Sequence, residues 1–107
     1  DLIHSGTLTG AQWETHMGNL VDAIHLEWPL AKVYLMRFIY TTRVPEQDLL
    51  DDTHMPNVIS TRSSWLFNGP DERTFLVGYL TDDKHPNVIG YHLTAQQWLN
   101  VLGYGIY

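Results

Sequence analysis

Apolar residues recur at helical spacing in the first quarter of the chain. From about residue 10 to about residue 28 they fall on one stripe, and Pro29 ends the pattern. This periodicity predicts an N-terminal helix that packs its stripe against a sheet, where it should meet Leu35, Ile39, Val77 and Ile89. The residues of the stripe are Trp13, Met17, Leu20, Val21, Ile24 and Trp28.

Two nearly identical stretches mark predicted helix starts. The sequence LTGAQW at 8–13 is echoed by LTAQQW at 93–98. In each copy the threonine, Thr9 or Thr94, is in position to cap the helix, and a glutamine three residues later can close a capping box. The second copy predicts a short C-terminal helix from about Ala95 to about Leu102, with Gly103 as its left-handed C-terminal residue.

The chain between these helices is rich in β-branched and aromatic residues, which favour strands. Turn-forming residues interrupt it at short intervals, and short links favour antiparallel pairing. The predicted fold class is therefore α+β: a four-stranded antiparallel β-meander flanked by an N-terminal and a short C-terminal helix. The strands are expected at 33–41, 58–67, 73–80 and 88–92, with turns at 68–72 and 81–86.

The length of 107 residues predicts a single domain, 1–107, in which 1–7 form a flexible or extended lead-in. With 44% apolar and 17% charged residues, the composition is that of a folded chain. The absence of cysteine excludes disulfides and thiolate chemistry, and it favours a cytoplasmic protein. No apolar run reaches the length of a membrane-spanning helix, so no membrane association is expected.

The formal net charge of −6 disfavours direct binding to nucleic acid, so none is expected, and it favours a protein partner with a basic surface. A second echo suggests where that charge gathers. Asp51–His54 and Asp82–His85 both read Asp-Asp-x-His. In a meander, both would lie in links at the same end of the sheet. We call this predicted cluster the acidic pole; it comprises Glu46, Asp48, Asp51, Asp52, Asp82 and Asp83.

The sequence leaves three functions open. The first is a small non-enzymatic interaction module, such as an inhibitor or antagonist, that docks its acidic pole on a basic protein. The second is a metal-binding module that uses His54 and His85, although their spacing matches no known metal motif. The echo is also explained by turn-forming residues alone.

The third is a small enzyme or ligand-binding protein with an aromatic-lined cavity between helix and sheet. No nucleophile motif or phosphate-binding loop supports a specific reaction, so no catalytic residue, metal ligand or cofactor is assigned. A homodimer remains open. The residues expected to line the cavity are Trp28, Trp65, Tyr79, Tyr91, His92 and Trp98.

Overall fold

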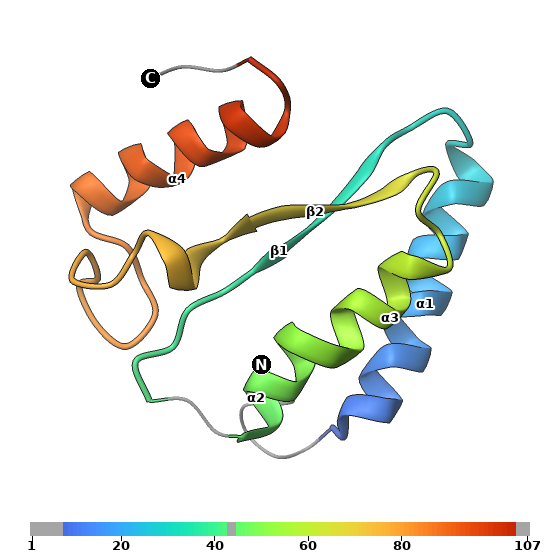
Figure 1. Cartoon of the computed structure of the whole chain (residues 1–107), viewed down its shortest axis with the longest axis horizontal. Coiled ribbons are helices and arrows are strands. Elements are labelled where there is room, and N and C mark those ends of the chain that lie inside the picture. The colour runs from blue at the N-terminus through green and yellow to red at the C-terminus, as the bar shows by residue number, and fades with distance from the viewer. Residues whose placement is uncertain (1–7, 43–44, 105–107) are drawn as a thin grey trace. The chain divides into compact units, whose positions relative to one another are not determined.

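The structure is a computed structural model that describes residues 8–42 and 45–104, so the predicted lead-in 1–7 lies outside the described residues. In the sequence, the two strands are separated by a single unbroken helical stretch, 45–60. It consists of three consecutive elements, α2, η1 and α3 (Figure 1). The elements in chain order are α1 (Gly10–Glu27), β1 (Val33–Arg37), α2 (Pro45–Leu49), the π-helical η1 (Leu50–His54), α3 (Met55–Ser60), β2 (Leu66–Asp71), the 3₁₀ turn η2 (Glu72–Thr74) and α4 (Val88–Val101).

β1 and β2 form a parallel two-stranded sheet, so the predicted four-stranded antiparallel meander is wrong. The Val33 N–H donates to the Trp65 carbonyl at 2.9 Å, and the Tyr34 and Phe67 rings lie 5.4 Å apart. The residue numbers of the paired positions therefore increase together along the two strands, as they do in a parallel pair. Parallel strands cannot be joined by a tight turn and need a long crossover, usually a helix. Helix 45–60 provides it.

The predicted strand 58–67 is mostly helix and turn. Four buried residues, Leu50, Met55, Val58 and Ile59, give helix 45–60 its apolar face. Pro56, which has no N–H to donate, lies inside this stretch directly after the π-helical η1. The polar run 60–64, which resembled one face of a strand, ends the helix and turns the chain into β2.

The predicted hairpin turn at 68–72 is also wrong, because 66–71 form β2. A two-stranded sheet leaves each strand an outer edge, where a proline such as Pro70 is tolerated. The predicted strand 73–80 is instead η2 followed by a loop. The turn predicted over 81–86 is present, closed by a bridge between Leu80 and Pro86.

The predicted strand 88–92 is the beginning of α4. Its N-cap is Asn87, whose Oδ1 accepts the Gly90 N–H at 2.9 Å, and not Thr94. Thr94 lies inside the helix, where its hydroxyl donates to the Gly90 carbonyl. The expected end is confirmed: Gly103 has a φ of +86°, and the Tyr104 N–H donates to the Leu99 carbonyl in a Schellman motif.

α1 begins as predicted, with Thr9 and Gln12 closing a capping box. Its predicted apolar stripe is correct in part: Trp13, Met17 and Ile24 are partly buried. Val21 is buried, but Leu20 and Trp28 are 54% and 61% exposed. Because Leu20 is exposed, Leu20→Ala should cost less stability than the truncation of a buried leucine. Two of the sheet positions predicted to meet the stripe, Val77 and Ile89, are exposed as well.

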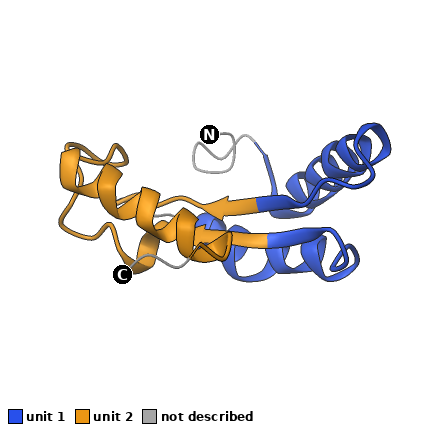
Figure 2. Ribbon diagram, turned by 90° about the horizontal axis from the view of Figure 1, so that it is seen from above, with its two compact units in different colours: residues 1–34, 43–67 blue, residues 35–42, 68–107 orange. Residues whose placement is uncertain are grey.

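The chain divides into two compact units (Figure 2): residues 1–34 with 43–67, and residues 35–42 with 68–107. The first unit holds α1 and helix 45–60. In the second, the Trp98 ring of α4 lies 3.0 Å from the place where a Cβ on Gly69 of β2 would stand. Both strands begin in the first unit and end in the second. That residues 1–107 form a single domain stays a prediction.

None of the helices in the described residues is long and apolar enough to cross a membrane.

The start of α4 can be checked by two alanine substitutions. Asn87→Ala removes the N-cap and should lower the free energy of unfolding by about 1 kcal/mol. Thr94→Ala should cost less, because alanine is the better helix former and no cap is lost. Urea denaturation of both variants measures the difference. A larger loss for Thr94→Ala than for Asn87→Ala would contradict this start.

Candidate functional site

In the first unit, α1 and helix 45–60 run parallel. Three side-chain pairs join α1 to helix 45–60 or to the turn that follows it, and each pair is separated by 40 residues in the sequence. Because the residue numbers of both partners increase together from one pair to the next, α1 and the segment 54–65 run in the same direction. The pairs are Glu14–His54, Asp22–Arg62 and His25–Trp65.

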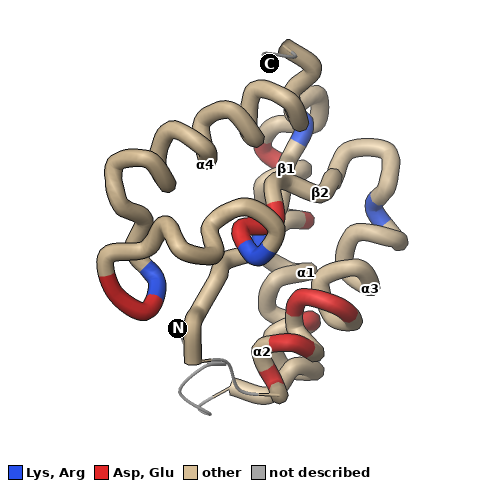
Figure 3. Tube along the Cα trace, turned by 60° about the vertical axis from the view of Figure 1, so that its left-hand side comes forward, with Lys and Arg blue, Asp and Glu red and all other residues tan. Residues whose placement is uncertain are grey.

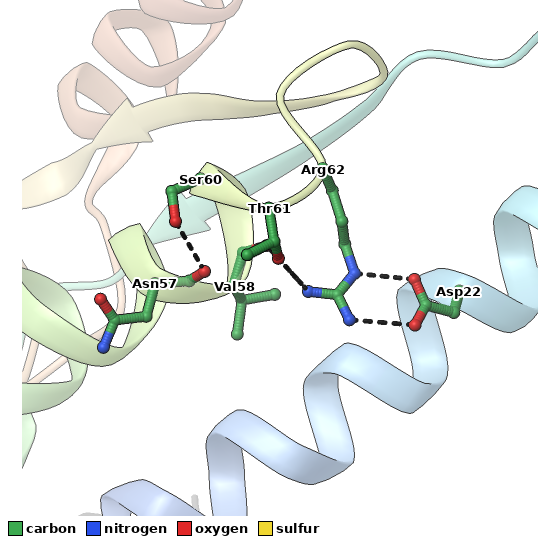
Figure 4. Close-up of polar contacts among 6 residues, drawn as sticks. All are labelled: Asp22, Asn57, Val58, Ser60, Thr61 and Arg62. Carbon is green, nitrogen blue, oxygen red and sulfur yellow. Dashed lines mark hydrogen bonds and ion pairs between the residues drawn. The ribbon is translucent and has the colours of Figure 1, made fainter.

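The strongest of these contacts is a bidentate ion pair. Both carboxylate oxygens of Asp22 accept from the Arg62 guanidinium, at 2.7 and 2.9 Å (Figure 4). These hydrogen bonds lower the pKa of Asp22 and raise that of Arg62. Arg62 also donates to the Val58 carbonyl, and a Cβ on Gly18 would stand 2.9 Å from its Nη2. Arg62 therefore connects the two helices.

A polar recess of about 440 Å³ lies beside these pairs, lined in part by Glu14 and Arg62. Both of its charged groups already have partners within the first unit. Glu14 accepts from His54 at 2.8 Å, and this hydrogen bond lowers the pKa of Glu14. The recess therefore presents no charged group that still needs a ligand.

The two histidines of the metal hypothesis have local partners. His54 contacts Glu14, while His85 contacts Asp82 at 2.6 Å in the second unit. Within 8–42 and 45–104, no three His, Asp or Glu side chains gather in a group that could hold a metal ion. The structure thus offers the metal hypothesis no donor set in its described part.

The acidic pole was inferred from the predicted antiparallel meander, and the structure does not have that topology. Without a meander, nothing in the connectivity brings the two Asp-Asp-x-His stretches to one end of a sheet, and they belong to different units. Asp51 is buried, at 1% exposure. Acidic positions do follow one another along α2 and η1 (Figure 3). The exposed ones there are Glu46, Asp48 and Asp52.

Asp82 and Asp83 hold the turn before α4. Asp82 accepts the N–H groups of Lys84 and His85, and these bonds depress its pKa strongly. Asp83 accepts from the Thr41 hydroxyl and from the Thr42 N–H and hydroxyl, which lowers its pKa to about 2. Both carboxylates therefore accept hydrogen bonds that stabilise the turn, which agrees with the interpretation of this stretch as turn-forming residues alone.

The aromatic residues predicted to share one cavity are dispersed. Trp65 stacks on His25 in the first unit, with ring centroids 4.1 Å apart. Trp28 and His92 are exposed, as is Tyr79 at 38%, and Trp98 covers Gly69. Tyr91 alone of the six lines the apolar cavity described next.

An apolar cavity of about 370 Å³ lies within the second unit. One wall consists of residues at and just after the end of β1. Glu72, the residue directly after β2, joins it, so the cavity lies where both parallel strands end. The turn before α4 and the side of α4 complete it. Its apolar and aromatic residues are Met36, Phe38, Ile39, Tyr40, Pro86 and Tyr91.

The polar residues of this cavity are few and unequally placed. Glu72 is 5% exposed, and its Oε1 accepts the Ile39 N–H at 2.9 Å. Burial raises the pKa of Glu72, and the charge of Asp71 adds to the rise, although the Ile39 N–H opposes it. Lys84 and His85, by contrast, are exposed at the rim.

Sequence patterns could not identify Glu72, because a charged residue after Asn-Gly-Pro-Asp is typical of a surface turn. Its burial follows from the parallel pairing, which brings the end of β2 beside Ile39. The one signal available was the unusual density of aromatic and apolar residues from Leu35 to Tyr40, which exceeds the needs of a strand with one partner.

No protein-family model, curated protein or solved structure matches this chain.

The contribution of Asp83 to the turn predicts a specific pH dependence. A carboxyl whose pKa falls from 3.8 unfolded to about 2 folded stabilises the protein fully above pH 4, and loses that effect as the pH falls toward 2. The wild type should therefore unfold at a higher temperature than Asp83→Asn at pH 5, and the difference should shrink toward pH 2. A difference that stays constant across this range would contradict the assignment.

Proposed function

We propose that the chain is a non-enzymatic binding module and that the apolar cavity of the second unit is its binding site. The observation that carries the proposal is the composition of this cavity. It joins a mainly apolar and aromatic lining to one buried carboxylate, that of Glu72. Ligand sites in proteins commonly have this form, in which the apolar walls bind and a few polar groups orient the ligand.

The position of the cavity supports the same proposal. In sheets of parallel strands, ligands bind beyond the carboxyl ends of the strands. Here β1 ends at Arg37 and β2 at Asp71, and both Ile39 and Glu72 line the cavity directly afterwards. The size is suited to a small molecule or to one large side chain of a partner.

The exposure of the rim also favours binding. Phe38 and Tyr91 are 56% and 60% exposed, although aromatic side chains of this size are usually covered. Both line the cavity, so a ligand seated there would cover apolar surface now in contact with water. Burial of such surface is the main source of affinity in apolar sites.

A second candidate function retains the expected basic protein partner. The acidic side chains of Glu46, Asp48 and Asp52 are exposed along α2 and η1 in the first unit. Clustered charge of one sign speeds association with a partner of opposite charge.

Reversal of all three acidic residues, Glu46, Asp48 and Asp52, to lysine should then weaken the salt-sensitive binding of poly-lysine, whereas reversal of Glu27 on α1 should change it less.

The proposed site can be tested with a neutral probe, 3-phenyl-1-propanol, by NMR titration of the backbone amides. Shifts should concentrate at 36–40, 72 and 84–94. Tyr91→Ala should weaken binding by about two- to tenfold, the loss expected for one aromatic contact.

The matched control is Tyr104→Ala, which removes an exposed tyrosine of the same unit that does not line the cavity. It should leave the affinity unchanged. Shifts scattered over the second unit, or equal effects of the two variants, would contradict the site.

A further inference from the structure

The wall of the apolar cavity carries one buried charge for which the described residues provide no counter-ion. Glu72 is 5% exposed and accepts one hydrogen bond, from the neutral Ile39 N–H. The carboxylate that precedes it, Asp71, acts on it by repulsion and is itself paired with Arg73 at 2.7 Å. Lys84 lines the same cavity without forming an ion pair with Glu72 in the described structure.

A buried carboxylate without a cation is unfavourable, because it has lost water and gained little in return. The raised pKa of Glu72 has this same cause. A cationic group of a ligand would remove the cost by supplying the missing partner. An anionic group placed beside Glu72 would increase it, so the deep part of the cavity selects by charge.

The aromatic side chains of the cavity favour the same sign of charge. Lys84 shows this directly, since its Nζ lies 5.9 Å from the centre of the Tyr40 ring. Aromatic faces attract ammonium groups within about 6 Å. Tyr91 and Phe38 also line the cavity, and the hydrocarbon portion of an amine can pack along such walls.

We propose that the ligand of this cavity is an amphipathic primary amine, with its protonated amino group against Glu72 and its apolar or aromatic body along Ile39 and Tyr91. This inference rests on the proposed function of the cavity. A free amine and a lysine side chain of a basic partner share this chemistry, and the net charge of −6 attracts both.

The two bases at the rim do not reverse this preference. His85 is balanced by Asp82, whose Oδ2 lies 2.6 Å from its Nδ1. Lys84 is exposed and lies over Tyr40, outside ion-pair distance of Glu72. Of the charged residues that line the cavity, Glu72 alone is buried.

The test compares three probes that share one body: 3-phenylpropylamine, 3-phenyl-1-propanol and 3-phenylpropanoate, each titrated against the full chain at pH 7. The amine should bind about tenfold more tightly than the alcohol, the usual gain of a hydrogen bond to a charged group. The carboxylate should bind most weakly.

Two variants test whether the preference for the amine comes from the charge of Glu72. Glu72→Gln keeps an acceptor for the Ile39 N–H but removes the charge, so amine and alcohol should then bind equally. Lys84→Gln removes an exposed competing cation and should increase the preference for the amine. A reduced preference in Lys84→Gln would overturn the proposal even if Glu72→Gln failed to fold.

The outcomes separate this inference from the proposed function. If all three probes bind the wild type equally, or the carboxylate binds best, the amine proposal fails while the binding site stands. If none binds, both fail. A blocked Gly-Gly-Lys-Gly-Gly peptide distinguishes the two sources of the amine. If the peptide binds as tightly as the free amine, the ligand is a lysine side chain of a basic protein. If it binds much more weakly, the ligand is a small amine.

Discussion

The parallel pairing of β1 and β2 determines where the other described elements can lie. Two parallel neighbours require a crossover that returns the chain to its starting edge. The segment between the strands therefore forms helix 45–60, with its apolar residues on one face. Because α1 also precedes a strand of this pair, the two helices run in the same direction, and Asp22 meets Arg62.

The same constraint creates the cavity. Parallel strands end at one edge of their sheet, so the residues that follow β1 and β2 emerge side by side. Ile39 and Glu72, 33 residues apart in the sequence, are joined there by a hydrogen bond. The turn held by Asp83 and the first turns of α4 cover this edge. An antiparallel meander would have separated these two chain ends, and Glu72 would have remained in a solvated turn.

Local signals in the sequence were sufficient for the start of α1 and the end of α4, but not for the start of α4 or for the topology. The capping box at Thr9 and the stop at Gly103 depend on neighbouring residues, and both predictions are confirmed. The two Val-Ile pairs, at 58–59 and 88–89, resembled strand starts but lie in helices. β-Branched residues lose only a few tenths of a kcal/mol in a helix, so burial decides the first pair and the Asn87 cap the second. Of the predicted cavity residues, Tyr91 alone was placed correctly.

The direction of the strand pair is the central claim, and cross-strand nuclear Overhauser effects between backbone protons test it most directly. The parallel arrangement predicts that Val33 contacts residues near Trp65 and that Leu35 contacts residues near Gly69, so that partner numbers rise together along both strands. Contacts from Val33 to the neighbourhood of Asp71, with partner numbers that fall as β1 is followed toward Arg37, would contradict it.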